Sequence, residues 1–191
     1  MLAAALALFA ADAGPVLADF PDDAPETGII EGWACPINLA PPPSDETDIG
    51  VRLKQELEQL RPWHDLWLEN RGRTTVGASE LDIEIAANFM AAFLDQTEPD
   101  NPRPELDVVE LMKLVVEDVK AFYLEAAMAQ PRESASQAVA DWFWGETVAG
   151  GIMLDLHQIL LEHPEKGLRF LARALLVPRL QQYRLEQHPV K

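Results

Sequence analysis

The chain has 191 residues, of which 48% are hydrophobic, so it is long enough to form one globular domain with a full core. Its formal net charge of −17 argues against binding to nucleic acid or to an anionic membrane surface, because both need clustered Lys and Arg. The single cysteine, Cys35, excludes a disulfide within the chain and fits a reducing compartment.

The charge is distributed unevenly along the chain. Residues 1–50 contain nine acidic residues and no Lys or Arg, whereas residues 165–191 contain six basic residues and two acidic ones. The two ends could therefore attract each other, within one chain or between copies, or each could simply solvate its own surface.

Residues 1–13 are rich in Ala and Leu and predict a short helix that ends at Gly14-Pro15. The helix has no capping residue, which suggests that it is the tail of a larger polypeptide. The apolar run is too short to span a membrane. A signal peptide over residues 1–18 would place the protein in the periplasm, but such a signal carries a basic start and the first basic residue here is Arg52, so a cytoplasmic protein is expected.

Residues 14–46 combine many prolines with many acidic side chains, and such a segment forms no core of its own. We interpret it as an extended acidic arm or linker that Trp33 could attach to the domain or to a partner. The helical domain then occupies residues 47–191.

The domain opens with two predicted helices separated by a proline. Residues 47–60 repeat apolar positions at helical spacing, and Pro62 suits the first turn of a new helix over residues 63–70. The loop that follows, residues 71–79, reads RGRTTVGAS and leads into another helix. Arg71, Arg73 and the backbone N–H groups of this loop could bind a carboxylate or phosphate, or the loop could be a structural turn.

Two further helices are predicted at residues 79–96 and 105–130. The second has apolar residues at alternating spacings of four and three, which is typical of the seam of an antiparallel bundle. Asp118 and Glu125 flank this seam and could form a carboxylate cluster with Glu146. No Glu-x-x-His occurs in the chain, so a di-metal site of the ferritin type is not expected, and we predict neither a metal nor a cofactor.

Residues 134–163 form the longest apolar stretch and predict one continuous central helix. Its glycines suggest close approach of another helix, a kink, or room for a ligand beside Glu146. His157 is expected to be a hydrogen-bonded core or boundary residue. It lies eleven residues after Glu146, about 16 Å along a helix, so the two cannot share a metal ion.

Helices are also expected at residues 165–177 and, after Pro178, at residues 179–187. The predicted fold is therefore all-α, a single-domain antiparallel bundle of about five to seven helices that carries the extended acidic Pro-rich N-terminal arm.

Motifs for catalysis are absent from the sequence: it has no G-x-S-x-G, no zinc-ligand spacing and no Gly-rich nucleotide loop. The sequence therefore favours a non-catalytic helical module that binds another protein or the rest of a larger chain, or that forms a homo-oligomer. Accessory domains and maturation chaperones or adaptors of redox enzyme complexes are acidic helical chains of similar size, which is an analogy only.

The alternative is a small-molecule or enzymatic site in the helical core. It would be lined by aromatic side chains, with Glu146 as its polar contact and Arg71 and Arg73 at its mouth. The lining residues would be Trp142 and Tyr123, together with Phe122, Phe143 and Met153.

Overall fold

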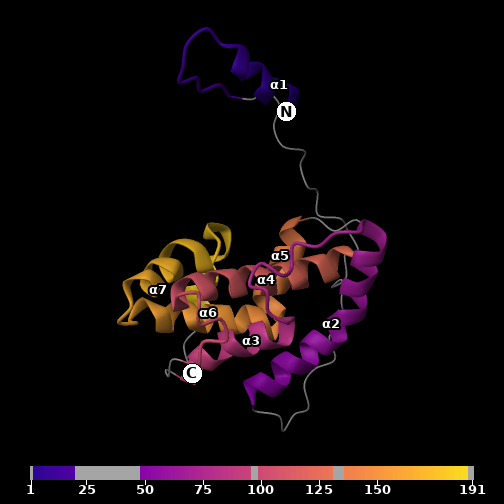
Figure 1. Ribbon diagram of the computed structural model, residues 1–191, viewed down its shortest axis with the longest axis vertical. Helices are drawn as coiled ribbons and strands as arrows, with labels where there is room; N and C mark the ends of the chain where they lie inside the picture. The colour runs from indigo at the N-terminus through magenta and orange to yellow at the C-terminus, as the bar shows by residue number, and fades with distance from the viewer. Residues whose placement is uncertain (1, 20–47, 96–98, 131–135, 189–191) are drawn as a thin grey trace.

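The computed structural model describes residues 2–19, 48–95, 99–130 and 136–188, and within these ranges the chain forms helices and no strand (Figure 1). The all-helical class is thus confirmed, although the eight α-helices of the described residues exceed the number expected. None of the described helices is long and apolar enough to cross a bilayer. Residues 20–46 of the predicted acidic arm lie outside the described residues.

The first helix of the domain, α2 (Ile49–Arg71), is continuous and contains Pro62 in its interior. The expectation of two helices meeting at Pro62 is therefore wrong. Proline removes one backbone hydrogen bond and costs about 3 kcal/mol in a helix interior. Pro62 is exposed, so the carbonyl that it leaves unpaired can bind water, while Leu57 and Leu60 before it and His64 after it are buried and hold the helix together.

The next helix is α3 (Ile83–Ala92), extended by a 3-10 turn, η2 (Phe93–Asp95). The sequence placed its start at Ser79, whereas the N-cap is Asp82, whose carboxylate accepts a hydrogen bond from Glu84 N at 2.8 Å. Ser79 has a different role, described below. Glu80, with φ of 55°, makes the turn between them.

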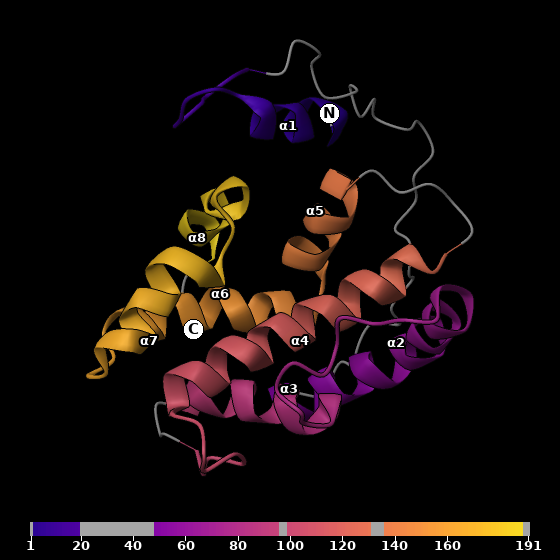
Figure 2. The same ribbon diagram turned by 45° about the horizontal axis from the view of Figure 1, so that its top comes forward.

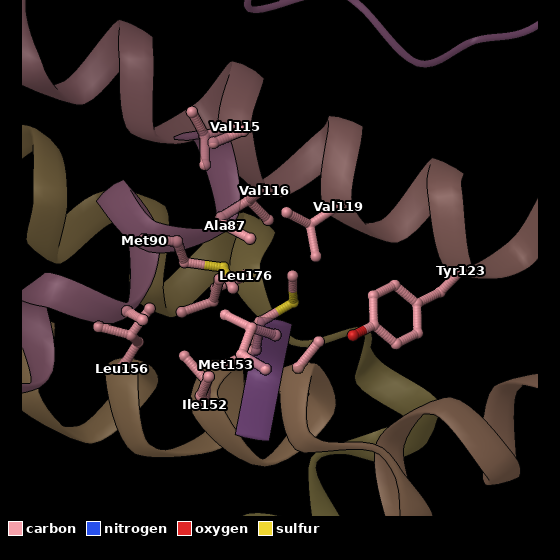
Figure 3. Packing of buried hydrophobic residues seen from close by; sticks show 14 of the residues in the cluster. Ala87, Met90, Val115, Val116, Val119, Tyr123, Ile152, Met153, Leu156 and Leu176 are labelled. Atoms are coloured by element: carbon pink, nitrogen blue, oxygen red, sulfur yellow. The ribbon is translucent and has the colours of Figure 1, made fainter. Parts of the chain in front are cut away.

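Helix α4 (Val108–Met128) is the central element and contacts α2, α3, α5 and α7. Asp107 caps it by accepting a hydrogen bond from Glu110 N at 2.8 Å. The apolar seam predicted for this helix is buried apart from the half-buried Val108, and the side chains that face it from α3 and α6 are buried too (Figure 3). Figure 3 labels the seam residues Val115 and Val119, and beside them the buried Val116 and Tyr123 of the same helix.

The central stretch forms two helices rather than one, α5 (Ser136–Glu146) and α6 (Val148–Leu161), which meet at a sharp corner (Figure 2). Thr147 makes this corner: its backbone is extended and its hydroxyl accepts from Gly150 N at 3.0 Å and donates to Phe143 O at 2.7 Å. A Cβ on Gly150 would lie 2.0 Å from Phe143 O. The glycine there permits this close approach, so the expectation of one continuous helix over residues 134–163 is wrong.

The chain ends in α7 (Lys166–Leu171), a π-helical turn, η3 (Ala172–Leu176), a 3-10 turn, η4 (Arg179–Gln181), and α8 (Tyr183–Gln187). These elements form one end of the domain in both views (Figures 1 and 2). Near the N-terminus, α1 (Leu2–Ala7) and the 3-10 turn η1 (Leu8–Ala10) confirm the short predicted helix. Neither of these two elements buries a residue.

Candidate functional site

The loop at residues 71–79 does bind carboxylates, but they are two side chains of α4. Asp118 is 1% exposed and accepts hydrogen bonds from the backbone N–H groups of Gly77, Ala78 and Ser79 at 2.8, 2.8 and 2.9 Å. The Ser79 hydroxyl donates a fourth at 2.5 Å. The carboxylate of Asp118 thus occupies the place that an external anion would take.

Glu125, two turns further along α4, is bound by the first half of the same loop. The hydroxyls of Thr74 and Thr75 donate at 2.6 and 2.8 Å, and Thr75 N donates at 2.7 Å. His64 Nε2 of α2 lies 3.1 Å from the same carboxylate. Burial tends to raise the pKa of Glu125, but the hydrogen bonds from Thr74 and Thr75, with the nearby His64, hold the pKa below its usual value.

The two arginines predicted to form an anion site lie outside this network. Both are exposed; Arg71 stacks on the ring of Trp67, 5.0 Å from its centroid. Because the N–H groups at residues 75 and 77–79 bind Glu125 and Asp118, they are not available to assist Arg73 in binding a ligand. Asp118 and Glu125 also form no cluster with Glu146, which is exposed at the end of α5.

A third buried acid is Glu56 of α2, a residue that the sequence interpretation missed. It is 6% exposed and accepts from the Tyr123 hydroxyl at 2.7 Å and from the N–H groups of Val148 and Ala149 at 2.9 and 3.2 Å. Burial raises the pKa of Glu56 despite these hydrogen bonds. Burial, with the adjacent Glu56 carboxylate, also raises the pKa of Tyr123.

Glu56 therefore caps the start of α6 from another helix, and the cap joins α2, α4 and α6 at one point. A carboxylate at a helix N-terminus binds free N–H groups and interacts favourably with the helix dipole. A signal was present in the sequence, because Glu56 lies on the same helix face as Leu53, Leu57 and Leu60 and so within the predicted apolar stripe.

The aromatic residues predicted to line a ligand pocket fill the core and pack against one another. Tyr123 is fully buried and Trp142 is 1% exposed, with ring centroids 6.2 Å apart, and Phe143 makes an edge contact with Tyr123 at 5.4 Å. Glu146 lies on the surface after the helix turns away, so the expected burial of this residue is wrong. A surface hollow of about 420 Å³ lies on α2, and none of the predicted pocket residues lines it.

His157 of α6 is half-buried, and its Nδ1 has no hydrogen-bond partner among the described residues. Burial lowers the pKa of this histidine. In the described part of the chain no group of three or more His, Cys, Asp or Glu side chains is arranged to hold a metal ion.

Lys120 of α4 has a structural role that the sequence did not indicate. Its Nζ donates to Leu176 O at 2.8 Å and lies 5.7 Å from the ring centroid of Trp144. It thereby satisfies a carbonyl at the end of η3 and ties the C-terminal elements to α4. Burial lowers the pKa of Lys120 to about 8.

The C-terminal elements also leave large apolar side chains exposed. Phe170 is 63%, Leu175 47%, Leu180 75% and Tyr183 48% exposed. Exposed basic residues lie among them in the sequence, namely Lys166, Arg173 and Arg179. We call these seven residues the C-terminal surface. The exposed acids Glu165 and Glu186 lie in the same stretch of chain, in which basic residues outnumber acidic ones.

Comparison with family models, with curated proteins and with solved structures finds no match to this chain.

Proposed function

We propose that this protein is a non-catalytic helical module that binds another protein through its C-terminal surface. Such a module could serve as an accessory domain, or as a chaperone or adaptor, of a larger enzyme complex, including a redox enzyme. The observation that carries the proposal is the exposure of Phe170, Leu175, Leu180 and Tyr183 on consecutive elements at one end of the domain. Large apolar side chains exposed on neighbouring elements of the chain are typical of interaction sites.

The charges on this surface favour an acidic partner. Lys166, Arg173 and Arg179 are exposed there, and basic groups around an apolar contact attract and orient an acidic binding segment. The partner segment that fits is therefore apolar on one side and acidic around it.

The buried ionisable groups are consistent with a module that performs no catalysis. Glu56, Asp118 and Glu125 each accept three or more hydrogen bonds from protein groups, which stabilise the fold and leave no free base or acid in that network. Catalytic acids and bases must instead be able to reach a substrate proton.

The test is chemical crosslinking in cells followed by affinity capture, with the wild type compared with a Phe170→Ser/Leu180→Ser double variant. We expect one or more specific proteins whose recovery falls at least tenfold in the double variant. Ile85→Ser is the matched control, because Ile85 is 51% exposed and lies on α3. Circular dichroism checks that both variants are folded. Equal recovery of every captured protein by all three forms would contradict the proposal.

A further inference from the structure

Lys120 differs from the other lysines that the structure describes. Lys54, Lys113 and Lys166 are exposed, whereas Lys120 on α4 is half-buried. An amine in such a place is only partly hydrated, and partial loss of water favours its uncharged form. The uncharged amine is the form that acts as a nucleophile.

The contacts of the Lys120 amine come from two other elements. Nζ donates to Leu176 O of η3 at 2.8 Å and lies 3.4 Å from Leu175 O, and the ring centroid of Trp144 of α5 is 5.7 Å away. None of these neighbours is a carboxylate, and among the described residues no acidic side chain forms an ion pair with Lys120. Glu117, one turn earlier on α4, is exposed and opposes the effect of burial on the amine without outweighing it.

This environment makes a substantial part of the amine neutral near physiological pH, because burial lowers the pKa of Lys120 to about 8. At pH 7.5 an amine with a pKa of 8 is about one quarter neutral, whereas an ordinary lysine with a pKa near 10.4 is only about 0.1% neutral. The lower basicity weakens the nucleophile by a smaller factor, as the Brønsted slope of about 0.5 for thiols illustrates.

Apolar side chains border this amine at the surface. Leu175 is 47% exposed, and Leu124, which lies one turn after Lys120 on the same face of α4, is 37% exposed. A reagent that reaches Nζ from this side meets apolar surface. The surroundings therefore suit a donor that carries an apolar acyl group on its electrophilic carbonyl.

We propose that Lys120 is a site of acylation by an activated acyl group, carried by an acyl phosphate or by an acyl thioester. The neutral Nζ attacks the acyl carbonyl carbon and an amide C–N bond forms. The C–O bond to phosphate or the C–S bond to the thiol breaks, and phosphate or thiolate leaves with the electron pair of that bond. Nζ gives one proton to water, so the modified side chain keeps one N–H and carries no charge.

Acylation weakens the connection between α4 and the C-terminal elements. The charge-assisted hydrogen bond to Leu176 O becomes an ordinary one, and the attraction of the ammonium to the ring of Trp144 is lost. We therefore expect η3, η4 and α8 to open more often once Lys120 is acylated.

Acetylation of the full-length wild type at pH 7.5 tests the site. Acetyl phosphate and acetyl-coenzyme A are the donors in separate reactions, and peptide mass spectrometry follows each lysine over time. We expect Lys120 to react at least about fivefold faster than Lys113, which is exposed on the same helix. This result with one donor alone would support the site and identify the donor class. A rate at Lys120 no higher than at Lys113 with both donors would overturn the proposal.

The dependence of the rate on pH separates nucleophilicity from accessibility. The rate at Lys120 should level off above about pH 8, whereas that of the free model compound Nα-acetyl-lysine amide should rise towards about pH 10. A rate at Lys120 that rises in parallel with the model compound would show an ordinary amine and would also overturn the proposal.

Hydrogen exchange tests the structural consequence in Lys120→Gln, which is uncharged like the acylated lysine. Amide exchange in residues 172–187 should be at least about threefold faster than in the wild type. Lys120→Arg keeps the charge and should stay close to the wild type, and Lys113→Gln is the matched control on α4. Circular dichroism checks that the variants are folded. Unchanged exchange in Lys120→Gln would refute the release of the C-terminal elements.

Discussion

The Glu56 carboxylate accepts a hydrogen bond from the Tyr123 hydroxyl at 2.7 Å, and both side chains are buried where α2, α4 and the start of α6 meet. The same carboxylate accepts the N–H groups of Val148 and Ala149. One acidic side chain of α2 thus accepts hydrogen bonds from a side chain of α4 and from the first N–H groups of α6.

This relationship predicts strong energetic coupling between the two residues. Tyr123→Phe should lower the free energy of unfolding by about 1.5–3 kcal/mol, because it removes a hydrogen bond to a charged group. Glu56→Ala should cost more, since it also leaves two N–H groups and the hydroxyl without their acceptor. Urea denaturation of both single variants and the double variant measures the coupling, and additive effects would contradict the geometry.

The hydrogen bonds from residues 77–79 to the Asp118 carboxylate predict that Asp118→Ala is severely destabilising. The substitution leaves the N–H groups of residues 77–79 and the Ser79 hydroxyl without an acceptor, and each unsatisfied buried group costs about 1–3 kcal/mol. A loss of at least about 3 kcal/mol is expected in urea denaturation. Glu117→Ala, one position away and exposed, is the control and should change stability by less than about 0.5 kcal/mol.

The lowered pKa of Glu125 predicts that the protein loses stability in acid. Its pKa is lower in the folded chain than the usual value of 4.5, so its stabilising contribution is complete above that value and declines as the pH falls towards the folded pKa. The difference in unfolding free energy between wild type and Glu125→Gln should therefore shrink as the pH falls below about 4.5. A difference that grows in acid would show that the carboxylate is not the stabilised form.

The corner between α5 and α6 predicts opposite effects at two adjacent glycines. Gly150→Ala places a Cβ 2.0 Å from Phe143 O, so we expect a loss of about 3 kcal/mol or more. Gly151→Ala meets no atom within 4 Å and should stabilise the helix by about 0.5–1 kcal/mol. Thermal denaturation of both variants tests the corner, because a continuous helix over the stretch would gain stability from both changes.

The lowered pKa of Lys120 predicts that its contribution to stability increases at alkaline pH. Its pKa falls from 10.5 to about 8 on folding, so the unfolded chain binds more protons between these values and the lysine contributes more stability as the pH rises. The unfolding free energy of the wild type should therefore rise relative to Lys120→Met between pH 8 and 10.5. An unchanged difference across this range would show that Lys120 titrates as an exposed lysine.

Prediction from the sequence succeeded for features that follow from the spacing of apolar residues along one helix. It failed where contacts with a distant element determine where a helix begins or ends. The apolar seam of α4 and the helical class follow from residue spacing. The break at Thr147 was missed because both halves are apolar at helical spacing. The hydrogen bonds of the Thr147 hydroxyl and of the distant Glu56 carboxylate compensate for interrupting the helix. Pro62 was expected to separate two helices, but the helix continues through it, because the packing of residues on both sides outweighs one lost hydrogen bond.

For the candidate site, the sequence left residues 71–79 open between an anion site with Arg71 and Arg73 and a structural turn. Backbone N–H groups and hydroxyls in one short loop are visible in the sequence, and they do bind carboxylates. That the carboxylates are Asp118 and Glu125 depends on α4 lying beside the loop. Glu146 was expected in the core because a single helix over residues 134–163 would place it on the apolar face. The helix instead ends at Glu146, and the side chain is exposed.

By itself the sequence determined the helical class, the acidic character, the seam of α4 and the opposite charges of the two chain ends, because each is a property of composition or of spacing along one segment. Only the tertiary structure decided which acids are buried, which donors bind them and which apolar side chains stay exposed. Those outcomes depend on contacts between residues 39 to 93 positions apart. Local periodicity indicates that one face of a helix is buried, but it does not indicate which residues pack on that face.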